Sequence, residues 1–233
     1  PRENIELMTA KLRMVSGKDG NFEKLIGEGG VQVKQWDRET RSDFAIYTQI
    51  DLEKQENFKN SSEKKIIPPQ QTLQLKGNVL IKATQGLVRS DTVLLDILGQ
   101  NAILEGPDTS KEGRIKVEAN LSELETKEGK SNSILTNNKK VNNEPRRVRL
   151  LASRAVLDNN KHQAMFEGDV EMESKPDNLF IHSGKITLNL GESQELLSIQ
   201  AIKDVCFEQP GRVAKAEKAS FKVMSPSEAS KWA

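Results

Sequence analysis

Apolar and polar positions alternate with a period of two along most of this chain. Residues 73–82 show it clearly, because polar side chains separate apolar positions such as Leu73, Leu75 and Ile81. A strand with one buried face has this pattern. The alternation recurs over residues 31–33, 44–46, 93–97, 115–117, 166–172, 186–190, 199–207 and 219–223. Gly, Asn, Asp and β-branched residues interrupt every long helical pattern, so the sequence predicts an all-β fold.

Two polar stretches interrupt the alternation. Residues 52–70 and 125–147 are rich in Lys, Asn, Ser and Glu and carry few apolar side chains. Segments of this composition bury too little apolar surface to order themselves, so we interpret both as polar inserts between strands. Residues 225–233 are predicted to form a flexible tail. Together with these segments, the strands are expected to form a single domain over residues 1–233.

A two-part unit recurs along the chain. Its first part places two residues, often Gly, Asn or Asp, before a valine, as in Gly77-Asn78-Val79 and Gly168-Asp169-Val170. Its second part is a polar turn into a further apolar strand, as in Ser90-Asp91. Gly, Asn and Asp in the first part suit a backbone that bends or takes positive φ. Strands of about 5–7 residues on each side would form antiparallel hairpins that bury their apolar faces only against neighbouring hairpins, leaving unpaired end strands.

Charge and residue chemistry exclude several classes of function. The chain has 35 Lys+Arg and 34 Asp+Glu, so it offers no basic surface for nucleic acid. A single Cys and two His exclude an internal disulfide and a Cys/His zinc site within one chain. No Gly-rich phosphate loop, nucleophile elbow or His-carboxylate spacing occurs. We therefore expect no enzymatic activity, no catalytic or metal-binding residues and no cofactor.

The repeated unit resembles the OstA-like repeats of the LptA family of periplasmic lipopolysaccharide-transport proteins. The resemblance is strongest from Gln163 to Val223, which ends in GRVAKAEKASFKV, and is weaker over residues 73–121 and 5–50. Relatives with the same fold include LptC and the amino-terminal domain of LptD. The resemblance implies a twisted β-jellyroll of antiparallel strands, open along one seam, which holds lipid acyl chains inside and stacks end to end with similar domains.

The alternation points twelve apolar residues toward the interior. They are Val31, Val33, Val79, Ile81, Val93, Leu95, Val170, Met172, Ile186, Leu188, Val205 and Phe207. Inward residues of any packed β-sheet follow this pattern, so the twelve form either a plain core or the lining of a ligand groove. The resemblance implies a lipid groove. An aromatic content of 4% favours the groove, because Val, Ile and Leu leave slots that Phe and Trp would fill.

The resemblance also implies a function: a non-enzymatic carrier or bridge that moves lipopolysaccharide across the periplasm to the outer membrane. The expected partners are lipopolysaccharide or a similar glycolipid, other OstA-like Lpt proteins bound through the end strands, and further copies of the chain in head-to-tail association. A periplasmic location is expected, with the signal segment absent from this sequence, which begins at Pro1. The alternative is a structural or interaction β-repeat protein, similar to LptC or to the amino-terminal module of LptD, with a filled interior.

Overall fold

The computed structural model describes residues 5–17, 20, 22–35, 38–49, 71–84, 86–97, 100–106, 114–120, 147–175, 178–192 and 196–222. Within them lie fourteen strands: β1 (Ile5–Met8), β2 (Lys11–Ser16), β3 (Phe22–Gln35), β4 (Arg38–Gln49), β5 (Gln71–Ala83), β6 (Gly86–Asp96), β7 (Asn101–Glu105), β8 (Ile115–Asn120), β9 (Arg147–Ala152), β10 (Arg154–Asp158), β11 (Gln163–Lys175), β12 (Leu179–Leu190), β13 (Leu196–Gln209) and β14 (Arg212–Lys222). The predicted insert 52–70 and tail 225–233 lie outside the described residues. So does 125–147, except Arg147, which begins β9.

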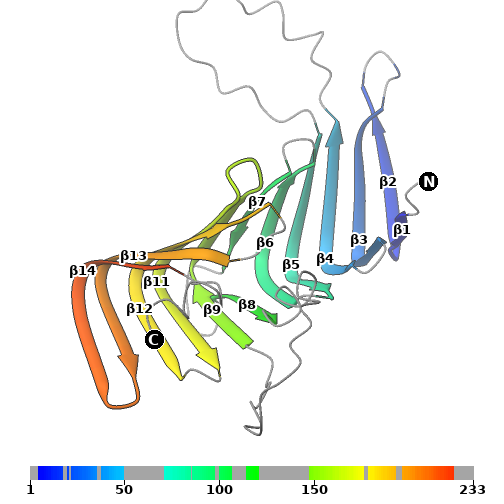
Figure 1. Ribbon diagram of the computed structural model, residues 1–233. Helices are drawn as coiled ribbons and strands as arrows, with labels where there is room; N and C mark the ends of the chain where they lie inside the picture. Colours follow the sequence, from blue (N-terminus) through cyan, green and yellow to red (C-terminus); the bar gives the residue numbers. More distant parts are fainter. Residues whose placement is uncertain are drawn as a thin grey trace, which may run out of the picture.

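All fourteen described strands pair antiparallel in one sheet (Figure 1). The main path runs β1-β3-β4-β5-β6-β7-β10-β11-β12-β13-β14. Strand β2 pairs with β3, β8 pairs with β6 and β9, and β9 also pairs with β11. No helix occurs among the described residues. The prediction of an all-β fold, built from antiparallel hairpins as a twisted jellyroll, is therefore confirmed.

The sheet consists of two strips of strand pairing that meet along one line. Strand β3 pairs with β2 over its first half and with β1 over its second half. Strand β6 pairs in the same way with β7 and β8, and β11 with β10 and β9. The long strands cross the line between the strips, and the short strands stop there. We call this line the corner, and the strips the leading strip (β2, β7, β10) and the trailing strip (β1, β8, β9).

At the corner, four long strands carry two successive residues with positive φ. These pairs are Gly29-Gly30, Gly77-Asn78, Gly168-Asp169 and Lys203-Asp204, with φ values between 49° and 83°. At each pair the register with the neighbouring strand shifts, which marks a β-bulge. A bulge bends its strand and increases the local twist. Because Gly, Asn and Asp adopt positive φ at little cost, their recurrence before valine is explained by the bend.

The predicted strand lengths were wrong. Strands of about 5–7 residues were expected, whereas β3–β6 and β11–β14 contain 11 to 14 residues each. The Gly-Asp pair does not start a strand, because the bulge displaces only two residues and pairing with the same neighbour resumes at the next valine. The second part of the repeat lies on the adjacent strand at the same corner, where Ser90 pairs with Val79.

Hydroxyl groups tie neighbouring strands together at the corner. The Ser90 hydroxyl lies 2.7 Å from the carbonyl of Thr92 on its own strand and 2.8 Å from the carbonyl of Glu105 on β7. Thr9 makes the equivalent contacts, 3.2 Å to the Lys11 carbonyl and 2.9 Å to the Glu28 carbonyl. Ser side chains favour such short-range bonds to the backbone. They add side-chain contacts to backbone carbonyls on both strands beside the bulge.

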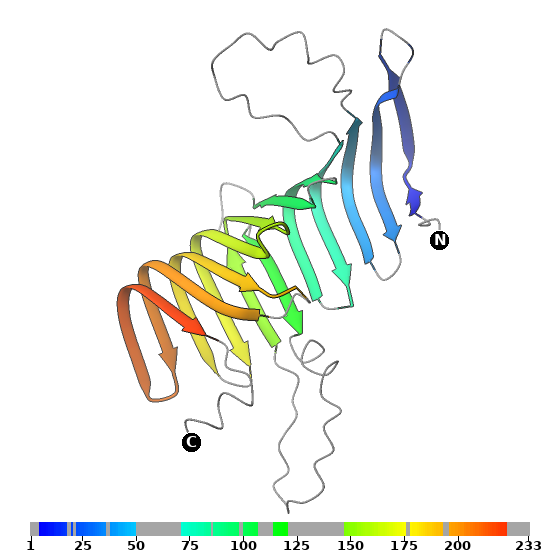
Figure 2. The ribbon, with the colours of Figure 1, turned by 45° about the horizontal axis from the view of Figure 1, so that its top comes forward.

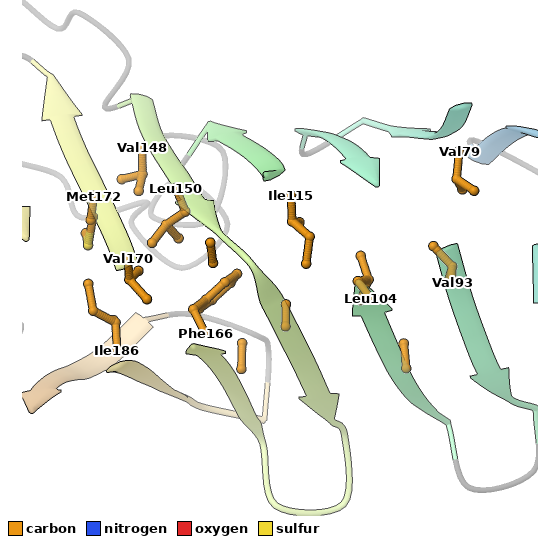
Figure 3. Packing of buried hydrophobic residues seen from close by; sticks show 14 of the residues in the cluster. Val79, Val93, Leu104, Ile115, Val148, Leu150, Phe166, Val170, Met172 and Ile186 are labelled. Carbon is orange, nitrogen blue, oxygen red and sulfur yellow. The ribbon is translucent and has the colours of Figure 1, made fainter. Parts of the chain in front are cut away.

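The bend brings the apolar faces of the two strips together. Figure 3 shows Val79 of the trailing strip opposite Val93 and Leu104 of the leading strip, and Met172 opposite Ile186. Strands β11–β14 curl strongly over this interior, whereas β3 and β4 are more nearly straight (Figure 2). The interior is therefore enclosed to different degrees along the sheet.

The corner geometry predicts a position-specific cost for replacing glycine. Gly168 has a φ of 82°, and an added Cβ would lie 2.7 Å from the Ser153 Cβ. Gly30 has a φ of 83°, and an added Cβ would meet nothing within 4 Å. Gly30→Ala should lower the free energy of unfolding by about 1–2 kcal/mol through the backbone alone. Gly168→Ala should cost a further ~1–3 kcal/mol from overpacking. Urea denaturation tests both variants, and equal losses would contradict the contact with Ser153.

Candidate functional site

Three rows of inward-facing residues cross the whole described sheet without a charged side chain. The first row consists of Met14, Leu25, Tyr47, Leu73, Leu95, Ala102, Leu157, Ala164, Leu188, Ile199 and Phe221. The second consists of Leu12, Gly27, Ala45, Leu75, Val93, Leu104, Ala155, Phe166, Ile186, Ala201 and Ala219. The third lies on the trailing strip and consists of Leu7, Val33, Thr40, Ile81, Val88, Val117, Leu150, Met172, Ile181, Phe207 and Ala214.

These rows differ in their distance from the corner. The second row lies next to the corner, and the first and third lie farther out on their strips. We call the first and third rows the two lips. Because the lips lie farther from the bend than the second row, side-chain exposure along them depends on how far the two strips stand apart.

All twelve residues predicted to face inward lie in the apolar interior or against it. Seven are buried: Val31, Val79, Val93, Val170, Met172, Ile186 and Val205. Five are partly buried and pack on them: Val33, Ile81, Leu95, Leu188 and Phe207. Whether they contact a lipid stays a prediction. The prediction missed buried residues that the fold adds, including Leu75, Leu104, Leu150, Phe166 and Ile181. For Leu75 and Phe166 the alternation was visible in the sequence.

The third row is partly buried over β3–β8 and buried over β9–β12. In the third row, Val33, Ile81, Val88 and Val117 are partly buried. On the strands that follow, Leu150, Met172 and Ile181 are 3%, 1% and 0% exposed. The first row is mixed: Leu73, Leu95 and Leu188 are partly buried, Ile199 is 5% exposed and Leu157 is 37% exposed. Along the third row, the strips therefore stand farther apart over β3–β8 than over β9–β12.

Exposed apolar side chains continue this opening to the amino-terminal edge. Leu12 and Met14 of β2 lie in the two inner rows of the leading strip and are 54% and 67% exposed. Leu7 of β1 lies in the third row and is 40% exposed. We call six of the partly buried lip residues on β3–β8 the open inner face: Val33, Leu73, Ile81, Val88, Leu95 and Val117. It presents aliphatic carbon without charge to solvent.

Charged residues occupy the outer face beside the corner. A cross-strand ladder runs from Glu105 through Arg154 and Glu167 to Lys185 on β7, β10, β11 and β12. Glu167 lies 3.2 Å from Arg154 and 2.9 Å from Lys185. The hydrogen bond from Lys185, with the charges of Lys185 and Arg154, lowers the pKa of Glu167 below its ordinary value of 4.5, while partial burial opposes this shift. We call these four residues the charge ladder.

A second polar group surrounds the corner of β11. The Arg114 guanidinium donates to the backbone carbonyl of Asp169 at 2.9 Å and contacts the Glu171 carboxylate at 2.9 Å. His182 Nε2 lies 2.7 Å from the Asp169 carboxylate. These bonds hold the left-handed Asp169 in place from the neighbouring strand β12 and from the residue that precedes β8. We therefore interpret Arg114 and His182 as residues that stabilise the corner.

Other chemistry-bearing groups are dispersed. Cys206 is partly buried, with its sulfur 3.6 Å from a Glu208 carboxylate oxygen. His162 is exposed in the turn before β11. Within the described ranges, no three His, Cys, Asp or Glu side chains gather as a metal site. The same ranges contain no helix that is long and apolar enough to span a bilayer.

Comparisons with known proteins give a limited result. No protein-family model and no curated protein sequence matches the chain. Among solved structures, it is similar to the crystal structure of LptH, the LptA-homologous periplasmic component of the lipopolysaccharide transport device of Pseudomonas aeruginosa. The alignment covers 81% of this chain and 95% of that chain, with 11% identity and a TM-score of 0.42. Functional inference therefore depends on the residues of this chain.

The charge ladder predicts a pH-dependent contribution of Glu167 to stability. Because the folded-state pKa of Glu167 is lowered, its contribution is present above the unfolded pKa near 4.5 and is lost as the pH falls through the folded pKa. Glu167→Gln should lower the free energy of unfolding by about 0.5–1 kcal/mol at pH 7, allowing for solvent screening. Urea denaturation at pH 7 and pH 3 measures this difference, which should be smaller at pH 3.

A matched control is Glu105→Gln, at the end of the same ladder. Glu105 is exposed and lies 3.8 Å from Arg154, so its loss should have a smaller effect. A Glu167 effect of the same size at both pH values would contradict the role of ionisation.

Proposed function

We propose that this protein is a non-enzymatic lipid carrier of the periplasm that binds acyl chains of lipopolysaccharide, or of a similar glycolipid, on its open inner face. The observation that carries the proposal is that the inner rows have no charge and that the open inner face is aliphatic and only partly buried. A core whose sole role was to stabilise the fold would gain from burying these side chains completely. Their partial exposure leaves apolar surface for a ligand to cover.

An acyl chain fits this surface chemically. Each buried methylene group contributes roughly 0.8 kcal/mol, so about twelve methylenes contribute on the order of 10 kcal/mol before the costs of ordering. No polar contact is required for such binding. Ile81, Val88 and Val117 are aliphatic neighbours in one row, which suits a flexible chain lying across several strands.

The end strands suit partners of the same architecture. Strand β14 ends the described sheet on one side, and β1 and β2 end it on the other. An unpaired strand edge can pair with a strand of another chain. Transfer of lipid to or from other OstA-like proteins, or between copies of this chain, would use these edges. We include such contacts in the proposal.

One observation favours a second function, a structural or interaction module with a filled interior. Over β9–β12 the inner residues Leu150, Met172 and Ile181 are buried, together with Phe166. Figure 3 shows these strands with the side chains of Leu150, Phe166, Val170 and Met172 gathered between them. This half of the sheet has the packing of an ordinary core. The two functions are distinguished by whether lipid reaches the open inner face.

Site-specific photo-crosslinking tests the carrier function. A photoreactive residue at Ile81, which faces inward, should form adducts with purified lipopolysaccharide, whereas the same residue at exposed Lys82 should not. The two positions are adjacent on β5 and differ only in the face they occupy, so Lys82 is a matched control. Immunoblotting for lipopolysaccharide on the crosslinked protein measures the adduct. Equal labelling at both positions, or none at Ile81, would favour the structural module.

A further inference from the structure

Three cationic side chains gather on the outer face of the trailing strip. Arg89 of β6 pairs with Lys116 of β8. Two residues farther along β8, Glu118 pairs with Arg149 of β9. All four side chains point away from the interior, because they alternate with inward-facing third-row residues of the same strands. We call Arg89, Lys116 and Arg149 the cation cluster.

The cation cluster carries more positive charge than its own carboxylate balances. The Lys116 ammonium forms an ion pair with Glu118 at 2.6 Å. The hydrogen bond from Lys116 lowers the pKa of Glu118 below its ordinary value of 4.5; burial opposes this shift, and the charges of the cation cluster add to it. Within the described ranges, Arg89 and Arg149 are exposed and form no ion pair. The near balance of charge along the whole chain therefore conceals a local excess.

The strands beside the cation cluster do not remove this excess. Among its described strand partners, the only other carboxylate is that of Glu173, opposite Arg149, and Lys175 lies 3.1 Å from it. The pairing of Arg89 with Lys116 places like charges directly opposite each other, which is unfavourable for stability. An anion bound between these side chains would relieve the repulsion.

The strands of the cation cluster also carry part of the open inner face. Val88 directly precedes Arg89, and Val117 directly follows Lys116. Strand β6 begins at Gly86, two positions before Val88, which is about 7 Å along an extended strand. Apolar chains on the open inner face therefore lie close to a strand end, beyond which a polar group attached to them can reach the outer face.

We propose that the cation cluster binds a phosphate group of the glycolipid whose acyl chains lie on the open inner face. This site rests on the proposed lipid-carrier function. A phosphate monoester carries about −1.5 to −2 charges at pH 7, which complements three cations that share one carboxylate. The guanidinium groups of Arg89 and Arg149 can each form paired hydrogen bonds with phosphate oxygens. The cluster thus selects phosphorylated glycolipids, a distinction that the apolar rows cannot make.

Binding of lipopolysaccharide with and without its phosphate groups tests the site. Purified lipopolysaccharide is compared with the same material after enzymatic dephosphorylation, and displacement of a fluorescent fatty acid measures affinity. The test variant combines Arg89→Gln with Arg149→Gln. The matched control, Arg13→Gln, removes an exposed, outward-facing arginine of β2. Thermal melting checks folding, and Arg89→Gln should not lower the melting temperature, because it removes the repulsion with Lys116.

The wild-type chain should bind the phosphorylated form about tenfold or more tightly than the dephosphorylated form. The double variant should lose this difference and keep its affinity for the dephosphorylated form, whereas Arg13→Gln should change neither affinity. Equal affinity of the wild-type chain for both forms would overturn the phosphate site while supporting the carrier function. Binding of neither form would overturn the carrier function and the phosphate site together.

Inorganic phosphate distinguishes a lipid headgroup from a free anion. Calorimetric titration with inorganic phosphate alone should show about millimolar affinity or weaker, because a free ion lacks the contribution of the acyl chains. Tighter binding of inorganic phosphate that Arg89→Gln with Arg149→Gln abolishes, together with equal affinity for both lipid forms, would assign the cluster to free phosphate and overturn its role in lipid recognition.

Discussion

The bend at the corner is the constraint on which the rest of this structure depends. Two successive residues in the left-handed region are unfavourable for most side chains, at roughly 1–2 kcal/mol each. Gly29-Gly30, Gly77-Asn78 and Gly168-Asp169 lower that cost, because these residue types tolerate positive φ. On β13, Lys203 takes a positive φ without that advantage. Hydroxyl groups such as that of Ser90 and the contacts of Arg114 with Asp169 then hold the bent strands in register. Without the bend, the apolar faces of the two strips would not meet.

Once the strips face each other, the distance between them decides whether the inward side chains are buried or partly exposed. Where they close, Met172 and Ile181 are buried as in an ordinary core. Where they stand apart, Ile81 and Val88 remain partly exposed. One sheet thus combines a part in which the third row is buried with a part in which it offers apolar surface. A division of this kind suits a carrier, because the filled half maintains the fold whether or not a ligand covers the open half.

Much of the inner face could be predicted from alternation alone. All twelve residues expected to point inward do so, from Val31 to Phe207, because a period of two assigns a face as soon as a strand is recognised. The strand lengths could not be predicted in the same way. A Gly-Asp pair looks the same in a sequence whether it ends a strand or bends it, and only pairing with the neighbouring strand distinguishes a turn from a bulge.

The sequence by itself determined the all-β class, the inward face of six long strands and the positions that tolerate positive φ, since these depend on local periodicity and on residue type. Only the tertiary structure decided which inward residues are exposed, because exposure depends on how far apart the strips stand. The tertiary structure also decided that the rings of Phe207 and Phe221 come into contact. Their rings lie on different strands and on opposite sides of the corner, and they meet only after the whole hairpin has folded over.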